Sequence, residues 1–379
     1  MLSQRSTQKM NLENNNRVIV VLGMHRSGTS VLTRSLQEMG VDLGHDFIEP
    51  QPMVNKKGFF EDVEINKLNV DLLTALNRDW DDLTFLPAFA FEQDNIASLK
   101  LRAIDLLRLK KSDKPFGLKD PRINRLLPFW QGVFKHLNLT PSYVIATRHP
   151  TSVMCSLKAR DGFDDEKSYY LWLEHVLPVI LETEGSKRVV VDFDLLLANP
   201  QAQIQRVAKS LDLPFEIDSI GVKKYIGDFL DKELRHTQFK LEDLHVAPNV
   251  PEGVTDTYRL LNRLARDEVD INSPEVKQKF EQVSTQLQTL SPALNYMTRA
   301  DKLLSECHQH FSSLTNETIR LGERESQLNT ELAVERSRLM TILSSNSWRL
   351  TMPLRELARF ARSPKQQLRR YAKMIKSKS

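Results

Sequence analysis

The chain has 379 residues, enough for one large α/β domain with an appendage or for two domains. Its hydrophobic content of 40% and charged content of 27% are ordinary for a soluble globular protein. No apolar run approaches ~18 residues, which excludes a membrane-spanning helix, and the polar N-terminus predicts no signal peptide. Cys155 and Cys307 form no metal-ligand or disulfide pattern, which suits a reducing cytosol.

Charge is segregated along the chain, although the net charge is only +4. Residues 348–379 contain ten Lys or Arg and one Glu, whereas the rest of the chain has 43 basic and 48 acidic residues. The body is therefore mildly acidic and the tail strongly basic. A basic terminus indicates an anionic partner surface, either lipid or nucleic acid.

Residues 18–36, VIVVLGMHRSGTSVLTRSL, are the most informative segment. The β-branched run Val18 to Val21 predicts a strand, Gly23 and Gly28 close a turn, and a helix begins at Thr29. This order of strand, glycine loop and helix presents backbone N–H groups to a phosphate. A chance strand-to-helix turn is the alternative, and the flanking elements and hydroxyl donors favour an anion site.

The spacing of the two glycines fits the P-loop pattern G-x-x-x-x-G-K-[ST], except that Thr29 occupies the lysine position. Because that lysine holds β- and γ-phosphates, the site is poorly built for ATP or GTP. Arg26 lies inside the loop and suits a single phosphate or sulfonate group. The candidate anion-binding residues are His25, Arg26, Ser27, Gly28, Thr29 and Ser30.

Short apolar strands alternate with helices along roughly the next 170 residues. Expected helices cover 62–77, 96–109, 150–158, 167–184 and 200–211, and expected strands cover 115–118, 143–147 and 189–193. This alternation predicts an α/β fold with a P-loop-type central parallel sheet covered by helices. Ligands of such sheets bind outside the carboxyl ends of the strands.

Two further motifs follow strand ends. In TRHPTSVMCS, Arg148 ends a strand and Ser156 lies on the following helix, so the two can grip one phosphate. In GLKDPR, Lys119 and Arg122 add positive charge, and Asp120 is placed to orient them. Each has a structural alternative: an ion pair at a strand end, and a salt-bridged turn.

Together the three motifs resemble the sulfotransferase family that uses 3′-phosphoadenylyl sulfate (PAPS), in particular its bacterial branch acting on carbohydrates. The resemblance covers roughly residues 17–240 and includes GMHRSGTS, GFFEDVEINKLN and GLKDPR. It implies that the glycine loop binds the 5′-phosphosulfate and that Arg148 and Ser156 bind the 3′-phosphate. VVVDFDLLLANPQ is similar to the family's later strand and helix, with Asp194 and Pro200 in the usual places.

The chain departs from the family pattern in one segment. The glycine-rich lid of the small-molecule branch is not recognisable, and KELRHTQF (residues 232–239) is its nearest equivalent. Within it, Arg235 is the candidate nucleotide contact. Arg26 replaces the loop lysine of many members, although some members also have arginine.

The resemblance implies sulfuryl transfer to an acceptor hydroxyl, with charge on the departing phosphate stabilised by Arg26 and the loop N–H groups. Lys119 is placed to assist, and no metal is expected. Glu61 is our candidate base, and a solvated surface carboxylate is the alternative. Asp62 is second choice, because it can instead cap a helix, and Glu49 and His25 are weaker.

The C-terminal part changes character near residue 301. A heptad-like register from Phe311 to Ile342 is apolar at seven of ten core positions, which predicts a coiled coil and possible pairing of two copies. One long helix folded back on the body is the alternative. SNSWRLTMPLR resembles a run in bacterial surface-polysaccharide enzymes, and the mixed apolar and basic tail suits an anionic membrane face rather than nucleic acid.

The sequence thus predicts a disordered segment 1–16, a sulfotransferase-like domain 17–300, a helical coiled-coil segment 301–345 and a basic amphipathic tail 346–379. The expected protein is cytoplasmic, peripheral at the inner membrane face, and modifies a glycan or surface polysaccharide. The alternatives are a P-loop kinase, disfavoured by the missing lysine, and a non-catalytic coiled-coil scaffold.

Overall fold

The structure is a computed structural model that describes residues 16–51, 57–110, 112–230, 239–247 and 249–376. Two compact units make up the chain, Met1–Arg299 and Ala300–Ser379, and each is treated separately below. The expected disordered segment 1–16 lies, apart from Asn16, outside the described residues.

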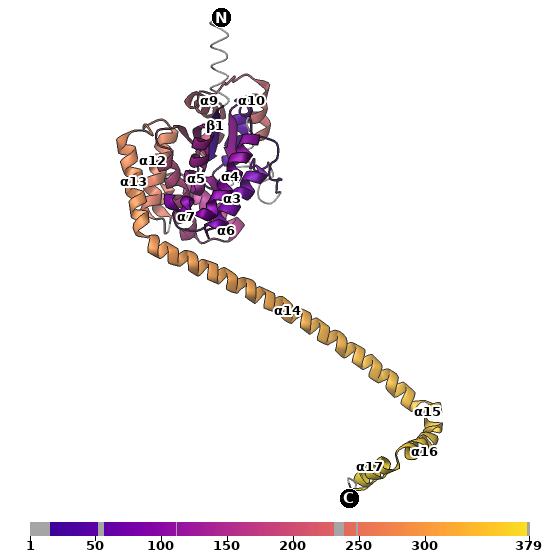
Figure 1. The fold of residues 1–379 in the computed structure, drawn as a ribbon. Helices are drawn as coiled ribbons and strands as arrows, with labels where there is room; N and C mark the ends of the chain where they lie inside the picture. Colours follow the sequence, from indigo (N-terminus) through magenta and orange to yellow (C-terminus); the bar gives the residue numbers. More distant parts are fainter. Residues whose placement is uncertain (1–15, 52–56, 111, 231–238, 248, 377–379) are drawn as a thin grey trace. The chain divides into compact units, whose positions relative to one another are not determined.

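A four-stranded parallel sheet is the centre of the first unit, in the order β2-β1-β3-β4 (Figure 1). The strands are β1 Arg17–Leu22, β2 Phe116–Lys119, β3 Thr140–Thr147 and β4 Lys187–Asp192. The expected parallel sheet is therefore confirmed. The expected strand 189–193 was wrong at its last residue, because Phe193 begins a helix that the Asp192 carboxylate caps.

Helices cover both faces of the sheet. The alternate residues Val18, Val20 and Leu22 of β1 pack into one core, and Ile19 and Val21 pack into the other. Helices packed on each face of the sheet complete the two cores. Because both faces are buried, the strands are continuously apolar rather than alternating.

Helices connect the strands of the first unit and cover the sheet. Their bounds are α2 Thr29–Gln37, α3 Val63–Ala75, η1 Ala88–Glu92, α4 Asp94–Leu109, α5 Ile123–His136, α6 Pro150–Asp161, α7 Asp165–Glu182, α8 Phe193–Ala198, α9 Pro200–Ser210, α10 Ile220–Lys224, η2 Tyr225–Phe229, α11 Asp243–Val246, α12 Glu252–Ala265 and α13 Pro274–Thr289.

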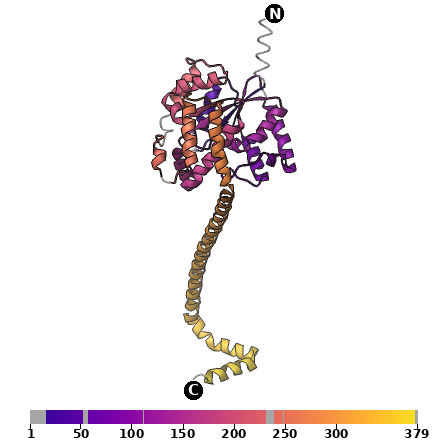
Figure 2. The ribbon, with the colours of Figure 1, turned by 90° about the vertical axis from the view of Figure 1, so that its left-hand side faces the viewer.

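Local signals explain where these helices begin. Asp62 caps α3 by accepting hydrogen bonds from the N–H groups of Glu64 and Ile65, as its alternative role predicted. His149 caps α6 through Nδ1, and Pro150 follows at the first helical position. The expected helices were present, whereas α5, α12 and α13 were not expected; α12 and α13 run side by side (Figures 1 and 2).

The second unit is entirely helical in its described part. Helix α14, Ser291–Ser344, begins in the first unit, where Leu294 and Thr298 are buried, and continues into the second. It is followed by α15 Asn346–Leu350, α16 Met352–Arg362 and α17 Pro364–Lys376. The heptad positions of α14 are exposed, and pairing of two copies along them stays a prediction.

Among the described residues, none of the helices combines the length and apolar character that crossing a bilayer requires.

Candidate functional site

Three motifs from distant parts of the sequence end at one edge of the sheet. Strand β1 is hydrogen-bonded to β2 on one side and to β3 on the other, all three in parallel. The residues after β1 form the glycine loop, Lys119 is the last residue of β2, and Arg148 follows β3. The carboxyl edge of the sheet therefore gathers the cationic residues that the motifs supplied, as expected for ligand sites of this fold class.

The glycine loop is held in a conformation that excludes larger residues at two positions. Gly23 has φ +150°, and its N–H donates to Asn124 Oδ1 at 3.1 Å. A Cβ on Gly28, with φ +83°, would lie 2.2 Å from the Phe193 ring. Gly28 is the N-cap of α2 and supplies no side-chain cap, so the N-terminal N–H groups of this helix face the loop without a capping side chain.

Arg148 and Ser156 contact the loop directly. Arg148 Nη1 donates to the carbonyl oxygen of Arg26 at 3.1 Å, and Arg26 Nε donates to Ser156 Oγ at 2.7 Å. The Arg148 guanidinium also lies over the Phe193 ring, 4.7 Å from its centroid. Residues more than 120 positions apart thus form one cationic site.

The electrostatics of this site favour an anion. Burial lowers the pKa of Arg26, and the neighbouring Arg160 and Arg148 guanidinium groups lower it further. Cations crowded in this way repel one another, so a negative group that binds between them lowers the free energy of the site.

Two buried hydroxyl groups add donors at the same edge. Ser27 in the loop and Ser152 in the first turn of α6 are each 1% exposed. Neither hydroxyl has a hydrogen-bond partner within the part of the chain that the structure describes. Buried polar groups are normally satisfied, so these hydroxyls fit a site that is completed by a bound phosphate or sulfate group.

A buried ion pair lies beside the loop's helix. Lys119 Nζ donates to Glu61 Oε1 at 2.6 Å and to the Phe59 carbonyl at 2.9 Å, and it lies 3.4 Å from Ser30 Oγ. Asn66 Nδ2 donates to Glu61 Oε2 at 3.2 Å. The surface-carboxylate alternative for Glu61 is wrong, because the residue is only 6% exposed.

Asp120 organises the residues behind this pair. It is fully buried and accepts hydrogen bonds from Asn66, Asn69 and the Arg122 side chain. Burial raises the pKa of Glu61, while the nearby Lys119 opposes that rise and the Asp120 charge adds to it. A carboxylate with a raised pKa is better matched to accepting a proton near neutral pH.

The other predicted residues lie in varied surroundings. Thr29 is buried at the start of α2, and the His25 ring packs against Trp80, with 4.5 Å between ring centroids. Burial and the neighbouring His175 lower the pKa of His25 far below its usual range, so it is neutral at pH 7. Glu49 is exposed, and Arg235 lies outside the described residues.

Two residues that position the site were not predicted. Asn124, fully buried, joins the loop to α7 by donating from Nδ2 to the His175 carbonyl. Phe193 supports both Gly28 and Arg148. Only Ile123 separates Asn124 from the GLKDPR motif, so its position shortly after a strand end could have marked it as a candidate site residue. Cys155 packs against the first hydrophobic core, and burial raises the pKa of its thiol.

Metal ligands do not gather at this edge: in the described ranges, no three His, Cys, Asp or Glu side chains are grouped as a metal site would require.

No protein-family model matches the chain, and no curated protein matches it. Three solved structures with some similarity are a sulfotransferase and two sulfotransferase domains. The sulfotransferase domain of the Synechococcus PCC 7002 olefin synthase is 13% identical, with a TM-score of 0.36, and the match covers 73% of this chain and 95% of that domain. The domain from the curacin biosynthetic pathway is 13% identical, with a TM-score of 0.35, over 72% of this chain and 97% of that one.

Sulfotransferase STF1 of Mycobacterium tuberculosis H37Rv is 14% identical, with a TM-score of 0.32, over 56% of this chain and 71% of that one. Because each of these TM-scores is below 0.5, we base the proposal below on the geometry of the site.

The ion pair of Lys119 with Glu61 predicts a pH-dependent cost for Lys119→Met. Without Lys119, the pKa of buried Glu61 rises further above its unfolded value, so the native state loses stability as pH rises through that pKa. We expect the variant to lose about 3–5 kcal/mol at pH 8 and much less at pH 4, where Glu61 is protonated. Urea unfolding at both pH values measures this.

Lys158→Met is the control, because Lys158 pairs with Asp165 at the surface. Its stability should stay close to that of the native chain at both pH values, because an exposed ion pair contributes little. A cost for Lys119→Met that is the same at pH 4 and pH 8 would contradict the ion-pair assignment.

Proposed function

We propose that this chain is a sulfotransferase that moves a sulfuryl group from PAPS to an acceptor hydroxyl. The observation that carries the proposal is the direct contact between the glycine loop and the Arg148–Ser156 pair. Arg148 donates to the Arg26 carbonyl, and Arg26 donates to Ser156. A site in which a glycine loop lies against an arginine–serine pair from a second strand end fits a ligand with two phosphate groups.

The residues of the loop fit PAPS better than a nucleoside triphosphate. Thr29 occupies the position at which a P-loop lysine would hold β- and γ-phosphates, and it is buried at the start of α2. Arg26 supplies one positive group near the loop N–H donors, enough for a single phosphosulfate. Arg148 and Ser156 are then available to bind the 3′-phosphate on the ribose.

The chemistry required of the protein is electrostatic. PAPS, when bound, would supply the activated sulfuryl group. Arg26 and the N–H groups at the start of α2 would stabilise the negative charge that develops on the departing 5′-phosphate oxygen. Because the loop that carries these donors is already held by Ser156, Arg148 and Asn124, little reorganisation is needed during the reaction.

Glu61 and Lys119 form the acceptor side of the proposal. Glu61 would take the proton of the attacking hydroxyl, since burial raises the pKa of its carboxyl. Lys119 lies between Glu61 Oε1 and Ser30 Oγ, so its charge is shared between the base and the loop's helix. We further propose a glycan acceptor, for which the support is the resemblance of GFFEDVEINKLN to the carbohydrate branch.

Removing Arg148 tests the donor assignment. In thermal-shift measurements, we expect adenosine 3′,5′-bisphosphate at 100 times its Kd to stabilise the native chain by about 2.7 kcal/mol relative to the unliganded protein. AMP or ATP at the same concentration should stabilise it less. Arg148→Met should lose most of the advantage of the bisphosphate over AMP, because Arg148 is the proposed contact to the 3′-phosphate.

Arg102→Met is a matched control on the surface of α4, where Arg102 pairs with Asp71. It should keep the preference for the bisphosphate. Stronger stabilisation by ATP with magnesium than by the bisphosphate would instead favour a P-loop kinase.

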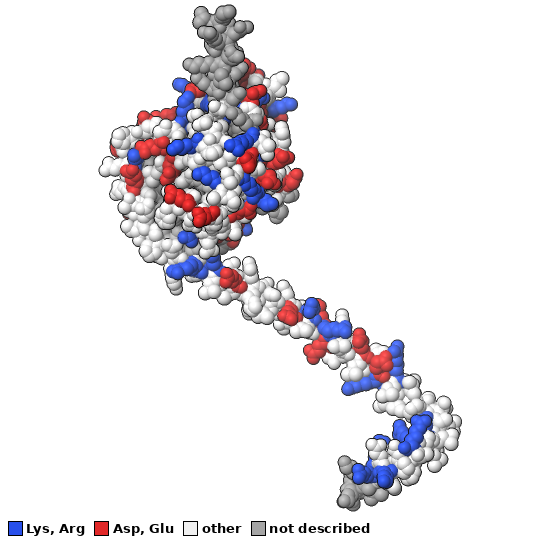
Figure 3. Space-filling view, viewed as in Figure 1, with Lys and Arg blue, Asp and Glu red and all other residues white. Residues whose placement is uncertain are grey.

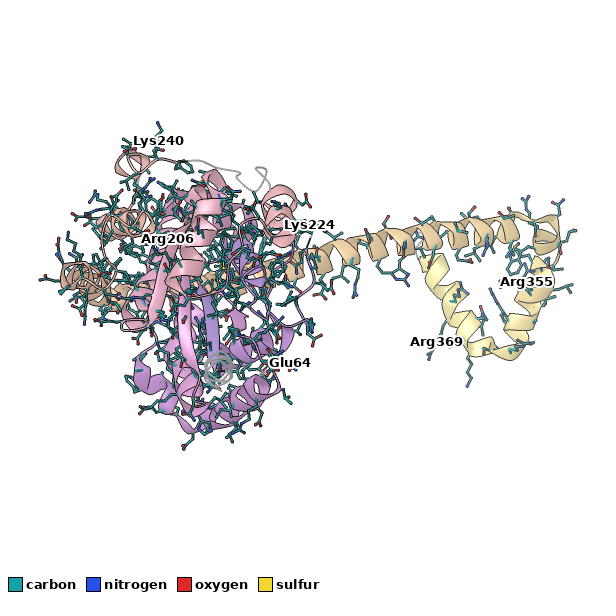
Figure 4. The ribbon with its side chains drawn as sticks, turned by 90° about the horizontal axis from the view of Figure 1, so that it is seen from above. Glu64, Arg206, Lys224, Lys240, Arg355 and Arg369 are labelled. Atoms are coloured by element: carbon teal, nitrogen blue, oxygen red, sulfur yellow. The ribbon has the colours of Figure 1, made fainter. Side chains whose placement is uncertain are left out.

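Removing the carboxyl of Glu61 tests the base. Glu61→Gln should slow release of the bisphosphate from PAPS in the presence of glycan acceptors by roughly 10²–10⁴-fold, while bisphosphate binding in the thermal-shift assay is retained. Glu64→Gln, on exposed Glu64 of α3 (Figure 4), serves as the control. Full turnover by Glu61→Gln would remove Glu61 from this role.

We also propose that the tail binds an anionic membrane surface. On α16, Leu354, Leu357 and Phe360 lie on one face and are 67%, 67% and 41% exposed, whereas Arg355 and Arg359 lie on the opposite face. The tail's visible face shows Lys and Arg without Asp or Glu (Figure 3). Apolar groups facing one way and cations the other are typical of a helix lying in a membrane interface.

Truncation tests this membrane proposal. Full-length protein should float with vesicles that contain phosphatidylglycerol, and a 1–343 protein should not, because it lacks α15–α17. Binding of the full chain should fall as salt is added, since part of the attraction is electrostatic. Equal flotation of the two proteins would overturn the proposal.

A further inference from the structure

A second cavity lies within the first unit, outside the cationic site. It has a volume of about 440 Å³ and is formed by α5, α7, the segment 84–88 and the facing ends of α13 and α14. Its lining residues include Phe85, Leu86, Asn124, Arg125, Glu174 and Leu181. Of the residues described at the cationic site, only Asn124 also lines this cavity.

Glu174 is a buried carboxyl without a counter-ion in contact. The residue is only 2% exposed, and its carboxyl makes no hydrogen bond or close ion pair with any described residue. Burial raises its pKa to about 8, and the more distant charge of Arg125 only partly opposes this. A buried acid in this state has unused capacity to bind a donor.

Arg125 does not neutralise Glu174, because its guanidinium is used elsewhere. Its Nη1 donates to the carbonyls of Asp82 and, at 3.3 Å, Trp80, and its Nη2 donates to the Thr84 carbonyl at 2.6 Å. Arg125 therefore holds the residues directly before residues 85–88, which form one wall of the cavity.

Two prolines that line the same space leave two helix carbonyls without their usual intrahelical donor. Pro128 lies inside α5 and Pro178 inside α7, and both line the cavity. Proline has no N–H, so neither can donate to the carbonyl four residues earlier, which belongs to Asn124 and Glu174 respectively. Glu182 at the rim is a further acceptor.

We propose that this cavity binds a primary ammonium group carried on an apolar body, with the ammonium bonded to the Glu174 carboxylate. The ammonium offers three donors, which matches a wall of acceptors, and the apolar body fits against Phe85, Leu86 and Leu181. This site is separate from the proposed PAPS site, so it stands whether or not the chain transfers sulfuryl groups.

Binding of the ammonium requires Glu174 to ionise. Because the pKa of the empty site is about 8, the carboxyl is mainly protonated at pH 7 and must release its proton as the ligand binds. The charged groups that line the cavity in the described structure are Arg125 on α5 and Glu182 on α7; those from segment 84–88, α13 and α14 are uncharged. His175, next to Glu174, is neutral, since burial lowers its pKa to about 3.

The test is calorimetric titration of the full chain with 4-phenylbutylamine and with the neutral 4-phenylbutan-1-ol. We expect the amine to bind at least about tenfold more tightly than the alcohol, and its affinity to rise about tenfold per pH unit below pH 8. Titrations in two buffers of different ionisation enthalpy should show close to one proton released at pH 7.

Glu174→Gln should weaken amine binding by at least about tenfold and abolish the proton release. Leu181→Trp, which fills the cavity and keeps the carboxyl, should also block binding. Glu184→Gln, an exposed residue just past α7 that pairs with Lys277, is the control and should bind as the native chain does.

Equal binding of amine and alcohol would overturn the proposal, as would absence of proton release at pH 7. Unchanged amine binding in Glu174→Gln, or no heat of binding at millimolar amine, would overturn it as well.

Discussion

The hydrogen bond from Arg148 to the carbonyl of Arg26 is the contact on which the candidate site depends. It exists because β1 and β3 are parallel neighbours, which brings the residue after one strand against the loop after the other. Arg26 has a φ of +69°, a conformation that is uncommon for a residue with a side chain. The loop is therefore held by long-range contacts, not by local preference alone.

The sheet and its motifs could be predicted from the sequence because their signals are local. Val18 to Val21 are β-branched and apolar, and Pro150 marks the start of a helix, so neither depends on distant residues. Helix α5 was not expected, and Pro128 inside it is locally unfavourable, as is Pro178 inside α7, which was expected. There the apolar face of α5 outweighs the local penalty, since Trp130 and Phe134 are buried in the core.

The partners of the site residues were harder to predict than their positions. That Glu61 pairs with Lys119 follows from the fold of the segment between α2 and α3, which the sequence pattern leaves irregular. Asn124 was overlooked because its role is a single side-chain hydrogen bond to Gly23, and one amide in a helix carries no periodic signal. Glu174 likewise looks like an ordinary helical glutamate until its burial is known.

The Phe193 ring touches the space beside Gly28 on one side and the Arg148 guanidinium on the other. The separation between the start of α2 and the Arg148 guanidinium is consequently set by the thickness of one aromatic ring at the start of α8. For the donor proposed above, discrimination between isomers that differ only in phosphate placement would therefore depend partly on a residue that carries no charge.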